Sequence, residues 1–173
     1  MLPDPLHPAV VHLPMALAVI IPVMAFLGIW LIRREILPVR SWILVVVLQV
    51  LLLGSGWLAL ETGEEEEDRV ERVVAEDLIE EHEEAAERFM VLAGIALLAT
   101  GAGLMSGQRG SIGRAVGAAT TIAVLAAGVS VGHLGGELVY KHGAANAYLD
   151  EPAAMNSART GTHSDGDDDD DDD

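Results

Sequence analysis

Five of the six histidines in the chain lie at the ends of long apolar segments: His7, His12, His82, His133 and His142. Four membrane passes would bring all five to the same membrane face. Histidine is costly inside hydrocarbon, where it usually faces a partner in the protein interior. Neutral imidazole ligates haem iron, copper and zinc. The spacing therefore predicts a metal or haem centre at one membrane face.

Three of these histidines come from three different spans at one expected depth: His12, His82 and His133. Haem b needs two axial histidines, and a zinc or copper site needs three or four ligands, so the set suffices for either. We expect His12 and His133 to be the axial pair, because both lie in or at the end of strongly apolar spans. His7 is the weaker ligand, since it stands roughly 140° around a helix from His12. For any single histidine, capping a helix or hydrogen bonding at the interface is the simpler interpretation.

Two carboxylates are expected at the same level as the histidines. Glu61 ends the second span, and Glu137 follows His133 by one helical turn. A carboxylate that hydrogen-bonds a ligand histidine fixes its tautomer and raises its basicity. Met15 faces the same way as His12 and would favour copper(I), although core packing is the commoner role of methionine. The chain has no cysteine for a thiolate-held cluster and no nucleophile elbow or phosphate loop, so ligand binding is favoured over hydrolysis.

Four apolar stretches approach the length of about 20 residues that a membrane span requires. None of their central parts contains Asp, Glu, Lys or Arg, whereas helices of a small soluble bundle need a polar face. The sequence therefore predicts an all-α, integral membrane, four-helix antiparallel bundle with an acidic extramembrane helix. We expect the membrane domain to occupy residues 1–152. The predicted spans are 9–32, 42–60, 87–106 and 114–134.

Loop charges predict the orientation. Arg33, Arg34 and Arg40 lie between the first two spans, and Arg109 and Arg114 lie between the last two. Short loops rich in arginine stay in the cytoplasm. We therefore expect a multi-pass protein of the cell membrane with both termini extracytoplasmic and the first span kept as an anchor.

The acidic residues are concentrated in the remaining segments. The formal net charge is -17, which argues against nucleic acid as a partner and is typical of halophilic proteins, whose self-repulsion salt screens. Residues 64–86 predict an external acidic helix, and residues 153–173 a disordered acidic tail. Val70, Val73, Val74 and Leu78 form a stripe on that helix, which we expect to dock on the external face of the protein.

The histidines also belong to motifs that resemble those of an uncharacterised prokaryotic family of four-span membrane proteins, a domain of unknown function. The resemblance covers about residues 7–143, and Leu13 departs from it by replacing a usual Phe. Relatives joined to Rieske or c-type cytochrome domains imply electron transfer. The motifs are His7-Pro8-Ala9-Val10-Val11-His12-Leu13-Pro14, Thr62-Gly63, His82 and Gly132-His133-Leu134-Gly135-Gly136-Glu137-Leu138-Val139-Tyr140.

The leading functional prediction is haem b binding and electron transfer in a redox assembly, with partner proteins and the lipid bilayer as its contacts. Such a chain would be a redox subunit rather than an enzyme in itself. Two other classes stay open: a copper or other transition-metal binding or transport protein, and a non-catalytic membrane subunit that only assembles with partners.

Overall fold

The computed structural model describes residues 5–149, and every regular element in this part of the chain is a helix. The predicted tail at 153–173 lies outside the described residues. Four long helices carry the fold, and each is long and apolar enough to cross a membrane. The elements in order are α1 His7–Val10, α2 His12–Arg33, η1 Val39–Trp42, α3 Ile43–Val70, α4 Glu76–Ala102, α5 Gly107–Tyr140 and η2 Ala144–Tyr148.

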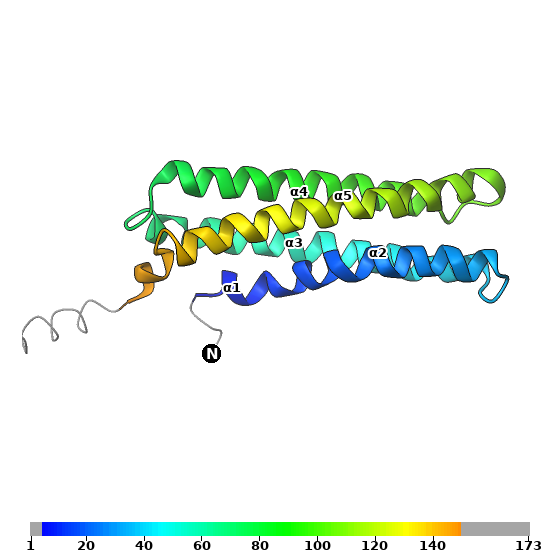
Figure 1. Cartoon of the computed structure of the whole chain (residues 1–173), viewed down its shortest axis with the longest axis horizontal. Helices are drawn as coiled ribbons and strands as arrows, with labels where there is room; N and C mark the ends of the chain where they lie inside the picture. Colours follow the sequence, from blue (N-terminus) through cyan, green and yellow to red (C-terminus); the bar gives the residue numbers. More distant parts are fainter. Residues whose placement is uncertain (1–4, 150–173) are drawn as a thin grey trace, which may run out of the picture.

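The four long helices lie side by side and run alternately in opposite directions (Figure 1). Helix α2 contacts α3 and α5, and α4 contacts the same two helices from the other side. One end of the molecule gathers α1, the link between α3 and α4, and η2; we call it the acidic end. The opposite end gathers the two arginine-bearing links and is called the basic end. This arrangement places the histidine-bearing ends of three helices, α2, α4 and α5, at the acidic end.

The sides of the long helices expose apolar residues to their surroundings. Val23, Val91 and Leu98 are each more than 60% exposed. Water would make such a surface unfavourable, whereas lipid tails are as apolar as the side chains themselves. The surface therefore agrees with the length and composition of the helices in favouring a bilayer environment.

Trp42 does not lie in a surface belt of aromatic residues, where membrane proteins often place tryptophan. It is only 1% exposed. Its indole Nε1–H donates a hydrogen bond of 2.8 Å to the carbonyl of Thr100. Trp30 is half exposed and lies under the guanidinium of Arg34. A buried indole needs such an acceptor, so Trp42 joins η1 to the end of α4.

The acidic segment is not the single helix predicted over residues 64–86. Helix α3 continues beyond its apolar part to Val70, and α4 begins at Glu76. The chain reverses between them because its apolar residues pack inward. Val74 and Ile79 are buried with Ala144, against Val70, Leu78 and Leu138. The residues of the predicted docking stripe thus pack on the protein at its acidic end, except for Val73, which is exposed.

Glycines let α4 and α5 approach closely near the basic end. A Cβ atom on Gly113 would lie 2.6 Å from the backbone nitrogen of Gly103, and one on Gly117 would lie 2.9 Å from the Cα of Thr100. Gly128 and Gly132, the spaced pair visible in the sequence, instead face the side chains of Phe89 and Met15. Close backbone packing through small residues is a common device of membrane helices, and here it uses the earlier glycines of α5.

Candidate metal centre

Helix α1 is fastened to α3 by the carboxylate of Glu66. Its Oε1 accepts hydrogen bonds from the backbone N–H of Leu6 at 2.7 Å and of His7 at 3.1 Å. The first N–H groups of a helix have no partner within the helix, and an anion is favourable at that end. Tyr148 donates its hydroxyl to Oε2 of the same carboxylate at 2.6 Å. Glu66 therefore holds both α1 and η2 against the part of α3 that lies at the acidic end.

The ring of His7 is held against α3 by a second set of contacts. Its Nδ1 lies 2.8 Å from the carbonyl oxygen of Ala59 and 3.4 Å from Oγ1 of Thr62. A Cβ on Gly63 would come within 3.3 Å of the ring, so the glycine makes room for it. A carbonyl oxygen can only accept, so Nδ1 carries the proton. In the neutral ring, Nε2 then keeps its lone pair for a ligand bond.

His82 enters the same region from α4. Its half-buried ring packs on α5 beside Gly135, where an added Cβ would lie 3.0 Å from Cε1. The backbone of Val131 lies near this ring and interacts with it electrostatically. Nδ1 of His82 is buried and has no hydrogen-bond partner among the described residues. Leaving a buried nitrogen without a partner costs free energy.

The two rings meet edge to face. Their centroids are 6.5 Å apart and their planes are inclined by 88°. A metal ion bonded at about 2.0–2.1 Å to one nitrogen of each imidazole would hold the centroids roughly 6 Å apart. The separation is therefore suitable for two ligands on one ion. The carbonyl of Ala59 fixes Nδ1 of His7, an arrangement that orients histidine ligands in metal sites.

The predicted axial pair lies elsewhere, on exposed surfaces of α2 and α5. His12 is exposed, and the side chain of His133 is 72% exposed. Both belong to the same level of the molecule, because Met15, one turn after His12, lies against Gly132. The structure records a ring contact for His7 with His82 and none between His12 and His133. Their role as ligands stays a prediction.

The two predicted supporting carboxylates also lie outside the pair of rings. Glu61 is exposed. Glu137 has an oxygen 3.9 Å from Nε2 of His133 and 3.3 Å from Nζ of Lys141, so it remains beside the histidine it was predicted to support. Among residues 5–149 no group of three or more His, Asp or Glu side chains is arranged to hold a metal ion.

Sequence reasoning ranked His7 below His12 because it treated both as parts of one helix. Helices α1 and α2 meet at Val11, whose backbone is helical and continues the i→i−4 hydrogen bonds from His7 to Met15. His7 and His12 thus lie on different faces as predicted, but the face of His7 is the one that contacts Ala59, Thr62 and Glu66 of α3. The motifs in the sequence could have indicated the position of the two rings, because Thr62, Gly63 and Gly135 are among the residues that contact them. Glu66 stood in an acidic run and had no distinguishing feature.

No family model, curated protein or solved structure matches this chain.

Proposed function

We propose that this is an integral membrane bundle whose acidic end faces the extracytoplasmic side and holds a redox-active metal centre on His7 and His82. The arginine-rich links favour a cytoplasmic basic end. The centre would serve a membrane redox assembly, as the resemblance of its motifs to those of an electron-transfer-linked family implies. Of the four predicted metal ligands it keeps His7 and His82 and leaves out His12 and His133.

The observation that carries this proposal is the contact between two imidazoles from separate helices. His7 gives Nδ1 to the carbonyl of Ala59, which leaves its Nε2 for a ligand. Nδ1 of His82 is buried without a partner among the described residues. An ion bound between the two rings would give this nitrogen a partner.

Copper(I) is the ion that this pair favours. Zinc takes four ligands, or three and a water molecule, and residues 5–149 offer no such cluster. Copper(I) tolerates fewer ligands, and imidazole suits it. A copper ion held by His7 and His82 would supply one-electron redox chemistry. The chain itself would fix both rings, shield them from water and place them within reach of a partner protein at the acidic end.

Haem b is the second candidate, because it also needs two histidines and the 6.5 Å separation of the rings would allow an iron ion between them. The packing of the rings is less favourable to it. His7 lies on Gly63 and His82 on Gly135, and a porphyrin entering between them would require the helices to separate. The exposed pair His12 and His133 would avoid that obstacle, at the price of a cofactor on the outer surface.

An absorption spectrum and an elemental analysis of the purified protein test the proposal. The protein should be produced in cells supplied with both copper and haem precursors and purified in mild detergent. We expect copper in stoichiometric amount and no Soret band. A Soret band without copper would support the haem alternative, and the absence of both cofactors would contradict a redox centre and favour a non-catalytic assembly subunit.

A further inference from the structure

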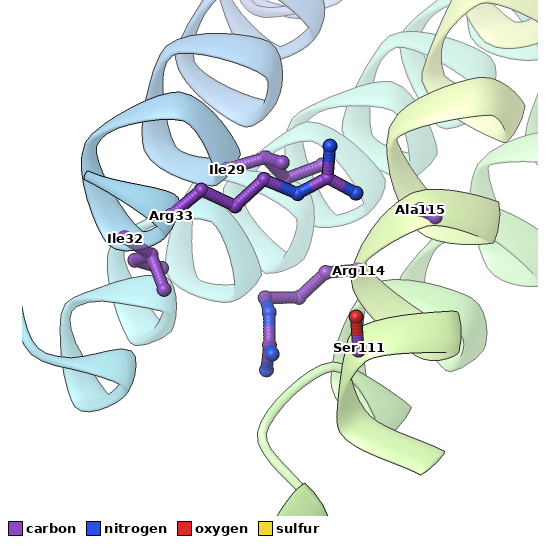
Figure 2. Close-up of a pocket in the computed structure, with 6 residues that line it drawn as sticks. All are labelled: Ile29, Ile32, Arg33, Ser111, Arg114 and Ala115. Carbon is purple, nitrogen blue, oxygen red and sulfur yellow. The ribbon is translucent and has the colours of Figure 1, made fainter. Parts of the chain in front are cut away.

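A small cavity at the basic end opens between α2 and α5, far from the histidines. It is lined by Ile29, Ile32, Arg33, Ser111, Arg114 and Ala115. Figure 2 shows the side chain of Arg33 reaching from α2 toward α5 and that of Arg114 reaching from α5 into the space between the two helices, with the hydroxyl of Ser111 beside it. Two cationic side chains and a hydroxyl thus line a space whose remaining walls are apolar, with the two guanidinium groups turned to opposite sides of it in this view.

The positive charge of this cavity is not neutralised by the described part of the chain. Among residues 5–149 the structure records no ion pair for Arg33 or Arg114. Arg114 is half-buried, and one of its nitrogens donates a hydrogen bond of 2.6 Å to the carbonyl of Gly103. This bond fixes the guanidinium and leaves its other donors free. Glu35 is the only acidic residue in the two links of the basic end.

Side chains typical of the boundary between hydrocarbon and headgroups lie beside the cavity. Trp30 is on the preceding turn of α2, half exposed, with the guanidinium of Arg34 5.9 Å from its ring centroid. Tryptophan and arginine together mark the interfacial level of membrane helices. Toward the membrane centre the walls of the cavity are the side chains of Ile29 and Ala115, which suit an acyl chain.

We propose that this cavity binds the phosphate group of an anionic membrane lipid. Arg33 and Arg114 would donate charge-assisted hydrogen bonds to the phosphate oxygens, and Ser111 would donate its hydroxyl. Ile29, Ile32 and Ala115 would contact the first part of an acyl chain. Basic pockets between membrane helices on the cytoplasmic side recognise lipid headgroups in this way. The site is independent of any cofactor at the acidic end.

Native mass spectrometry of the full chain in detergent tests this site. Phosphatidylglycerol and phosphatidylcholine with identical acyl chains are titrated separately, and inorganic phosphate and glycerol 3-phosphate are added as competitors. We expect phosphatidylglycerol to bind about tenfold more tightly than phosphatidylcholine, because its anionic headgroup keeps both charge-assisted contacts. The soluble phosphates should compete only weakly, since they lack the chain that contacts the isoleucines.

Substitutions locate the binding. Arg33→Gln and Arg114→Gln should each remove most of the preference for phosphatidylglycerol, whereas Arg109→Gln, with the same loss of charge on a neighbouring turn of α5, should retain it. Arg33 is exposed, so Arg33→Gln should fold, and its lipid preference can be measured even if Arg114→Gln fails to fold. Equal binding of the two lipids, or an unchanged preference in Arg33→Gln, would overturn the proposal. Equally tight binding of inorganic phosphate would also overturn it, in favour of a soluble anion.

Discussion

The imidazole rings of His7 and His82 show how the position of a polar group is fixed inside an apolar protein. Each ring is packed against one glycine, Gly63 for His7 and Gly135 for His82, and His7 is also held by the carbonyl of Ala59. The glycines provide the space, and the carbonyl selects the tautomer of His7. Neither contact needs a charged partner. The two rings are therefore fixed while one nitrogen of each remains available for a metal.

Glu66 is the residue on which the position of His7 depends. We expect Glu66→Ala to lower the stability by about 2–4 kcal/mol. Three donors lose their acceptor, and although a hydrogen bond to a charged group contributes about 1.5–3 kcal/mol, water can replace part of this loss at a half-buried site. Chemical denaturation in detergent measures this loss. Glu65→Ala is the control, because this substitution removes the same charge from an exposed position. Equal effects of the two substitutions would show that Glu66 acts only through charge.

Gln49 is a polar residue buried in the apolar core. Its side chain is 1% exposed, and neither amide atom has a hydrogen-bond partner among the described residues. An unsatisfied buried polar group costs about 1–3 kcal/mol, so Gln49→Met should raise the free energy of unfolding by about 1 kcal/mol, with Gln108→Met at the basic end as an exposed control. A loss of stability in Gln49→Met would indicate that the amide has a partner such as bound water.

At the scale of the elements, packing between α4 and α5 depends on backbone contact. Gly113→Ala should destabilise the protein by about 1–3 kcal/mol, the usual effect of overpacking, because the new methyl group would meet the backbone of Ala102 and Gly103. Gly94→Ala is the matched control. Its Cβ would meet nothing within 4 Å, so it should gain up to about 1 kcal/mol from helix propensity. Thermal unfolding of both variants should give shifts of opposite sign, and shifts of the same sign would contradict the close approach.

The elements themselves were largely predictable, and their relative rotation was not. Long apolar runs identify the four helices because each run must satisfy its own backbone hydrogen bonds. The turn after Val70 was missed because charge pattern predicted one acidic helix, whereas burial of Val74 and Ile79 reverses the chain. The meeting of His7 with His82 was missed because periodicity describes the faces of one helix. It does not specify which face the neighbouring helices cover, and here α3 covers the face that carries His7.

At the scale of the whole molecule, charge is divided between the two ends. Most described carboxylates lie on the parts of α3 and α4 at the acidic end. The basic end holds five arginines: Arg33, Arg34, Arg40, Arg109 and Arg114. This division favours one orientation in the membrane and gives each end a different class of partner. Anionic lipids suit the basic end, and proteins with basic surfaces suit the acidic end.

The net charge of -17 also predicts a dependence on salt. Carboxylates crowded on α3 and α4 repel one another, and salt shortens the range of this repulsion from about 10 Å at 0.1 M to about 3 Å at 1 M. We therefore expect the Tm in detergent to rise between dilute buffer and molar potassium chloride. An uncharged osmolyte at equal osmolarity controls for general solvent effects. An unchanged Tm would count against adaptation to high salt.

The most direct test of the proposed centre is the copper content of four matched variants. His7→Ala and His82→Ala remove the two rings that meet, whereas His12→Ala and His133→Ala remove exposed rings at the same end of the molecule. All four are purified from copper-supplied cells, and their helicity is checked by circular dichroism. The account predicts that copper is lost from the first two variants and retained by the last two. Retention by His7→Ala and His82→Ala, with loss from His12→Ala and His133→Ala, would contradict it.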